Sequence, residues 1–215
     1  MFHRSALTAL IAVATLSTPA LSQSAQRWSV QASGLYVGVL GDAYAGLENG
    51  PGLELQLRVT PSLWSYGGGL QYSSHELTGA PGNSISLSGI FFEPRRVLDI
   101  GSARYAPYLS GRAAYLQQEA DFGNGTTLRA SGFQGNVGGG VLARLSPRVN
   151  LDLGVTLGVI QFGDAELKSN GQVQGTFGGT SGTGQNVVVR AGLAIGLGGG
   201  SKSAAPATTK PATRR

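Results

Sequence analysis

Apolar side chains recur at every second position over most of the chain, which is the period of a β-strand. In residues 187–197 every odd position is apolar, whereas the even positions carry Val188, Arg190 and small residues. Apolar residues at the odd positions of 149–159 alternate in the same way with Asn150, Asp152, glycine and threonine. Because successive side chains of a strand point to opposite faces, each segment predicts a strand with one apolar face.

Eight segments of this kind follow one another, and most are long enough for a tilted membrane-spanning strand of about 9–11 residues. They cover residues 28–41, 53–60, 64–73, 85–98, 104–118, 128–145, 149–159 and 187–197. In the first segment the apolar phase changes near Gly34, which we interpret as a bulge or a glycine kink. In the fourth, Pro94 interrupts the pattern near one end.

The connections between these segments are alternately short and long. The short ones are 60–62, 99–103 and 146–148, and the long ones are 42–51, 77–84, 119–127 and 164–184. Outer-membrane barrels have short periplasmic turns on one rim and longer extracellular loops on the other. The pattern therefore predicts an all-β protein, an eight-stranded antiparallel up-and-down transmembrane β-barrel. The Gly- and Thr-rich loop 164–184 is expected to be mobile and exposed.

The composition of the polar faces separates a membrane barrel from a soluble one. A soluble barrel would expose its polar face, which should then be rich in Lys and Glu. Here that face is mostly small and uncharged, and no lysine occurs between residues 23 and 167. This favours the membrane, while a soluble periplasmic barrel that binds an apolar ligand stays open as an alternative.

An eight-stranded barrel leaves an interior just wide enough for its own side chains. Charged residues on the polar faces should project into it and pair there, because a buried unpaired charge is costly. The predicted lumen network consists of Glu54, Arg58, Arg112, Asp152 and Arg190. We therefore expect a polar, charged and largely plugged lumen.

Amphipathic aromatic rings prefer the two boundaries between water and lipid. Five of them fall near the rim of the short turns. The predicted aromatic girdle consists of Trp28, Trp64, Tyr66, Tyr105 and Tyr108.

Both ends of the chain differ from the middle. Residues 1–22 have a short positive start, an apolar run at 6–16 and small residues at Ala20 and Ser22, which predicts a signal peptide cleaved after Ser22 and export through the inner membrane. Residues 26–199 form the predicted barrel, and 200–215 are expected to be a disordered basic periplasmic tail.

Charge and cysteine content exclude several classes of function. The formal net charge is +5, but it comes from the two ends, so a basic nucleic-acid-binding face is not implied. The chain has no cysteine, which excludes disulfides and thiolate metal sites.

Two stretches resemble the small outer-membrane barrel family of the OmpA, OmpX and opacity-protein type. They are APYLSG at 106–111 and GIFFEPRR at 89–96, together with the glycine-rich final strands. The resemblance implies a non-enzymatic role in envelope structure, surface recognition or adhesion, or at most permeation through a small pore. The partners that we expect are outer-membrane lipid, lipopolysaccharide and the outer-membrane assembly machinery, with the protein a monomer and any extracellular ligand unspecified.

One alternative is an outer-membrane lipid-modifying enzyme. His75 lies near the predicted loop rim and shares a strand face with Ser73, as a nucleophile and its base would require. A solvated histidine at a strand end explains the same residues, and we predict that the protein is not an enzyme. No cofactor and no metal site is predicted.

Overall fold

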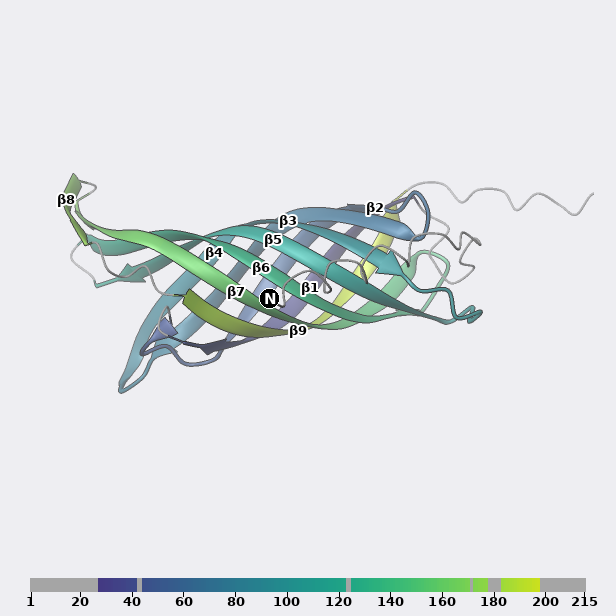
Figure 1. Cartoon of the computed structure of the whole chain (residues 1–215), viewed down its shortest axis with the longest axis horizontal. Helices are drawn as coiled ribbons and strands as arrows, with labels where there is room; N and C mark the ends of the chain where they lie inside the picture. The colour runs from purple at the N-terminus through teal and green to yellow at the C-terminus, as the bar shows by residue number, and fades with distance from the viewer. Residues whose placement is uncertain (1–26, 42–43, 123–124, 171, 178–182, 198–215) are drawn as a thin grey trace, which may run out of the picture.

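The computed structural model describes residues 27–41, 44–122, 125–170, 172–177 and 183–197, and the described part of the chain is all β (Figure 1). The strands are β1 (Trp28–Leu40), β2 (Gly50–Val59), β3 (Trp64–Leu77), β4 (Ala80–Val97), β5 (Tyr105–Asp121), β6 (Thr126–Arg144), β7 (Val149–Ser169), β8 (Gln172–Phe177) and β9 (Thr183–Leu197). The predicted signal peptide and the predicted tail lie outside the described residues. Within the described residues, no helix is long and apolar enough to cross a membrane.

Eight of the nine described strands close into a barrel. Each strand from β1 to β7 is antiparallel to the next in sequence, and β9 lies between β7 and β1. The strand β8 pairs with β7 alone among the described strands and projects beyond the barrel wall (Figure 1). The predicted eight-stranded antiparallel up-and-down barrel is confirmed, and β8 is an addition to it.

The strands on the loop side are longer than the sequence pattern indicates. β7 continues to Ser169 and forms a hairpin with β8, so most of 164–184, predicted as a loop, is strand. In 77–84, β3 ends at Leu77 and β4 begins at Ala80, and the turn contains Gly79 with a φ of 78°. These extensions carry few apolar residues, and an apolar alternation therefore does not mark them.

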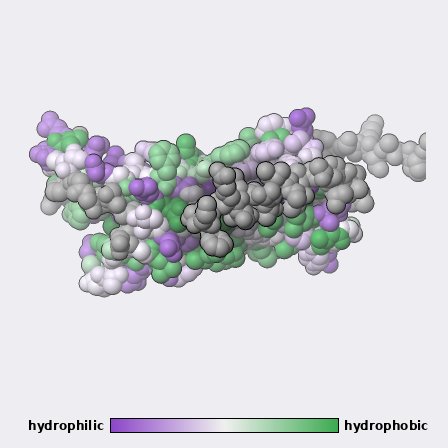
Figure 2. Space-filling model, in the orientation of Figure 1, coloured by the Kyte–Doolittle hydropathy of each residue, from purple (hydrophilic) through white to green (hydrophobic). Residues whose placement is uncertain are grey.

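The outer wall of the barrel is apolar in its middle. Large side chains there are exposed, such as Leu53 at 67%, Ile90 at 59% and Leu193 at 46%. Figure 2 shows hydrophobic residues along the middle of the visible face and more hydrophilic ones toward its ends. Such a wall matches a hydrocarbon layer, whereas soluble proteins rarely expose apolar patches larger than a few hundred Å².

β1 has no bulge at Gly34, contrary to our interpretation of its sequence. Its pairing with β9 is unbroken from one end to the other, and so is its pairing with β2 up to Val37. Ser29, Gln31 and Ser33 point inward, and so do the apolar side chains that follow at positions 35, 37 and 39. The apparent phase change arises because the barrel interior itself changes from polar to apolar along the strand.

The interior is therefore layered, with an apolar part toward the loops. The buried side chains of this part are Leu35, Val37, Val39, Tyr44, Ile85, Leu87, Phe91, Ala114, Leu116, Ala120, Ala130, Ile160, Phe162 and Ala165. We expected a charged lumen, but the described side chains that form this layer are uncharged.

The β1–β2 connection folds into the mouth of the barrel over this apolar layer. Tyr44 packs edge-on against Phe162, with ring centroids 6.2 Å apart, and is 4% exposed. Leu47 forms an isolated bridge with Leu77, and Asn49 accepts a 2.9 Å hydrogen bond from the backbone of β1. Burial away from water raises the pKa of the Tyr44 hydroxyl to about 12.

Candidate functional site

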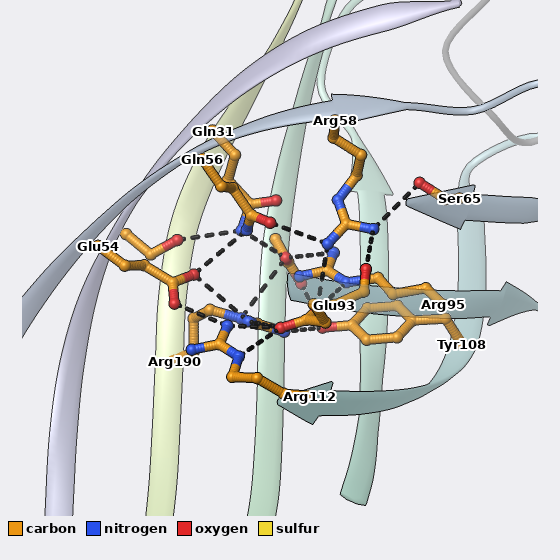
Figure 3. A network of polar contacts seen from close by, with 12 residues as sticks. Gln31, Glu54, Gln56, Arg58, Ser65, Glu93, Arg95, Tyr108, Arg112 and Arg190 are labelled. Atoms are coloured by element: carbon orange, nitrogen blue, oxygen red, sulfur yellow. Dashed lines mark hydrogen bonds and ion pairs between the residues drawn. The ribbon is translucent and has the colours of Figure 1, made fainter. Parts of the chain in front are cut away.

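The other half of the interior holds a cluster of buried charged side chains centred on Glu93 of β4 (Figure 3). Arg58 lies 3.2 Å from Oε1 of this carboxylate, and Arg95 Nε contacts the same oxygen. Arg112 and Arg190 lie 2.5 Å and 3.0 Å from Oε2. A single fully buried carboxylate thus faces guanidinium groups that come from β2, β4, β5 and β9.

Two more carboxylates complete the cluster. Glu54 of β2 lies 2.8 Å from Arg112 and 3.3 Å from Arg190. Asp152 of β7 lies 2.8 Å from Arg95, on the opposite wall of the barrel. The ion pairs therefore cross the lumen as well as joining neighbouring strands.

Uncharged side chains add hydrogen bonds to the charged groups of the cluster. Gln31 of β1 donates a 2.6 Å hydrogen bond to Asp152, and Ser65 of β3 accepts one of 3.1 Å from Arg58. Of the barrel strands, β6 alone contributes no side chain to these bonds among the described residues. The cluster links the wall almost all the way round.

The charges in this cluster do not cancel. Among the described residues, four guanidinium groups face three carboxylates, and all seven side chains are less than 9% exposed. Ions removed from water cost free energy, which their mutual attraction recovers only when the geometry is good. The network is therefore sensitive to the loss of any one carboxylate.

The structure brings together all five side chains predicted for the lumen network. The predicted set lacks its centre, Glu93, and also Arg95. The sequence pattern did not identify these two residues because they flank Pro94 within a charged stretch, where apolar and polar positions do not alternate. The register of β4 with β5 resumes unchanged after Pro94, so Glu93 and Arg95 share the inner face with Phe91. Counting inward positions from Ile85 would have found them.

Tyr108 does not belong to the aromatic girdle, and the prediction for this residue is wrong. Its ring is 2% exposed, and its hydroxyl donates a 2.7 Å hydrogen bond to Asp152 and accepts one of 2.9 Å from Arg190. Arg95 stacks over the ring at 4.4 Å. Tyr105 is exposed, and because three positions separate the two residues, they must face opposite sides of the strand.

Glycines on the neighbouring strands make room for Tyr108. A Cβ atom at Gly140 of β6 or at Gly154 of β7 would lie 2.5 Å or 2.6 Å from the Tyr108 hydroxyl. A tyrosine can enter the narrow interior only because these two positions lack a side chain. The glycine-rich strands are thus part of the site.

The other four predicted girdle residues point outward. Trp28, Trp64, Tyr66 and Tyr105 are 46%, 40%, 39% and 46% exposed. Trp64 stacks on Tyr66, and Tyr66 stacks on Phe92, which adds a ring that the sequence did not single out.

Small cavities lie on the two sides of the charge cluster. One, of about 20 Å³, lies toward the loops between Arg112, Gln71 and the apolar layer. The other, of about 30 Å³, lies toward the short turns beside Arg58 and Arg95. A water molecule needs roughly 10–15 Å³, so each cavity has room for about one to three waters.

Ser73 and His75 share a face and meet, but inside the barrel. Ser73 Oγ lies 3.0 Å from Nε2 of His75, whose Nδ1 lies 2.9 Å from the backbone oxygen of Glu48. His75 is fully buried rather than solvated, and its bond to Glu48 holds the β1–β2 connection in place. Among the described residues, no group of histidine and acidic side chains could hold a metal ion.

We predict that Glu93→Gln destabilises the barrel by about 3–5 kcal/mol, because four buried guanidinium groups then face two carboxylates. Urea unfolding from lipid vesicles measures the change. The double variant Glu93→Gln/Arg58→Gln restores an excess of one positive charge and should recover part of the loss. A single variant as stable as the wild type would mean that Glu93 is not the centre of the network.

We predict that Gly154→Ala destabilises the barrel by about 1–3 kcal/mol, because the new methyl group overlaps the Tyr108 hydroxyl. The matched control is Gly135→Ala on β6, where a Cβ meets nothing within 4 Å. The same urea experiment applies. In a Tyr108→Phe background the cost of Gly154→Ala should shrink, and an unchanged cost would contradict the overlap.

Comparison with known proteins gives a clear result for the fold alone. No family model matches the sequence, and no curated protein matches it. The crystal structure of Neisserial surface protein A matches with a TM-score of 0.58 and 18% identity, covering 79% of this chain and 97% of that chain. The crystal structure of the outer membrane protein OprG from Pseudomonas aeruginosa matches with a TM-score of 0.52 and 12% identity, covering 81% and 97%. This chain has the fold of the small outer-membrane β-barrels.

Proposed function

We propose that this chain is a non-enzymatic outer-membrane barrel that is sealed across its lumen and acts as an envelope scaffold for its extracellular connections. The observation that carries the proposal is the charge cluster, which joins opposite walls of the barrel through Glu93 and Asp152. The cavities beside it have room for a few waters and not for a larger solute.

The outer surface supports placement in a membrane. β1 carries Trp28 near the short turns and Tyr36 toward the loops, both exposed on the outer face. Aromatic rings border the apolar band of membrane barrels at both interfaces. Membrane lipid and the assembly machinery are then the partners that such a barrel needs, with lipopolysaccharide around its extracellular half.

Two alternatives have less support. A soluble ligand-binding barrel would have to leave outward leucines such as Leu53, Leu55 and Leu193 in water. A lipid-modifying enzyme would have to admit a lipid ester to Ser73 and His75, which line or adjoin a cavity of only about 20 Å³.

The first test places an arginine at two depths of the same strand face. Leu193 pairs with Ala32, midway between Trp28 and Tyr36, whereas Leu197 pairs with Trp28 itself. Leu193→Arg should cost about 2–4 kcal/mol near the membrane midplane, and Leu197→Arg about 0–1 kcal/mol near the interface. Urea unfolding from vesicles measures both. Equal costs, or a tolerated Leu193→Arg, would contradict membrane placement.

The second test addresses the sealed lumen. The purified barrel, reconstituted in planar bilayers, should give little or no conductance, because the charge cluster occupies the cross-section that eight strands enclose. A porin measured in the same bilayers is the positive control. A large, stable pore would show that the interior opens in the membrane and would overturn the sealed scaffold.

A further inference from the structure

The two rims of the barrel carry opposite charge. At the rim of the short turns, the described charged residues outside the lumen are Arg27, Arg96, Arg104, Arg144, Arg148 and Asp99. At the loop rim they are Glu48, Glu76, Glu119, Asp121, Asp164, Glu166, Arg129 and Lys168. The basic residues therefore concentrate at the turn rim, which we call the arginine rim, although the described barrel as a whole is nearly neutral.

Two of these arginines lie at the depth of the aromatic girdle. The guanidinium carbon of Arg96 is 5.5 Å from the ring of Trp64, and that of Arg104 is 5.6 Å from the ring of Tyr105. Both rings are exposed on the outer wall. Because such rings lie at the headgroup level of a membrane, the guanidinium groups stacked on them lie near the headgroup phosphates.

A groove on the same rim combines positive charge with apolar surface. It has a volume of about 360 Å³ and is lined by Ala103, Arg104, Arg144, Leu145, Ser146 and Pro147. The backbone N–H of Arg144 donates a 2.8 Å hydrogen bond to the carbonyl of Arg104, which fixes the two turns side by side. Leu145 is 58% exposed, so the groove offers an apolar contact beside two cationic residues.

We propose that this groove binds the phosphate headgroup of an anionic phospholipid from the leaflet that faces the short turns. Arginine suits the phosphate because its planar guanidinium donates several hydrogen bonds to the oxygens. Leu145 and Ala103 then contact the glycerol and the upper acyl chain, which a free phosphate lacks. The inference rests on the membrane placement proposed above.

The test is native mass spectrometry of the folded full-length barrel in detergent micelles, titrated with phosphatidylglycerol or with phosphatidylcholine. Phosphatidylglycerol should bind more tightly. Each arginine near an anionic lipid contributes about fivefold in affinity, so Arg104→Gln/Arg144→Gln should lose on the order of 25-fold. The matched control is Arg129→Gln at the loop rim, which should lose nothing. Arg104→Gln alone, which keeps Arg144 and its contacts, should lose about fivefold and covers the case in which the double variant does not fold.

Three results would overturn the proposal: equal affinity for the two lipids, equal losses in the groove and control variants, or complete competition by free glycerophosphate, which would indicate a site for a soluble anion. Insertion of the wild type into phosphatidylcholine vesicles is measured separately. If it inserts there but shows no preference for phosphatidylglycerol, the lipid site fails and the membrane barrel stands. If it inserts into no vesicle, the proposed function itself fails.

Discussion

A carboxylate taken out of water needs cations around it, and much of this barrel is arranged to supply them to Glu93. Its partners come from four strands, and three of those arginines also hold Glu54 or Asp152. The hydrogen bonds of the sheet hold only neighbouring strands together, whereas these ion pairs also hold opposite walls of the barrel in place. The polar half of the interior is thus braced across its width, in a space too narrow for bulk water to compete for the charges.

The remaining features of the interior follow from that narrow space. Tyr108 fits only because Gly140 and Gly154 have no side chains. Toward the loops, the described residues form no second charged cluster; apolar side chains fill the same width there, and Tyr44 covers the layer at the mouth of the barrel. One barrel therefore combines two kinds of core, one held by ion pairs and one by hydrophobic packing.

The barrel could be predicted from the sequence because the outer face follows a simple pattern: Leu193 and its neighbours at every second position are apolar. The inner face follows no such pattern, so its predictions were only partly right: the five predicted charged residues meet, but Glu93 at the centre of the network was missed. Leu35 points inward although it is apolar, and we interpreted the resulting change in the apolar pattern as a bulge at Gly34. Tyr108 was assigned to the girdle by its closeness to a turn, although its parity places it inside. The strand β8 and the end of β7 extend past the apolar band, where alternation carries no signal.

The charge cluster also has a consequence for how the barrel is assembled. Gln31 of β1 and Asp152 of β7 are 121 residues apart, and Glu54 of β2 and Arg190 of β9 are 136 apart, so side-chain contacts over the β1–β9 pairing join early strands to late ones. Until β9 reaches β1, the carboxylates of β2 and β4 lack some of the cations that hold them in the finished molecule. If the barrel is inserted in a membrane as proposed, an open sheet with these charges cannot lie in hydrocarbon, and its interior must stay hydrated until the last strand arrives. Closure of the barrel and loss of water from its interior are then one cooperative event, and partly closed barrels should not accumulate.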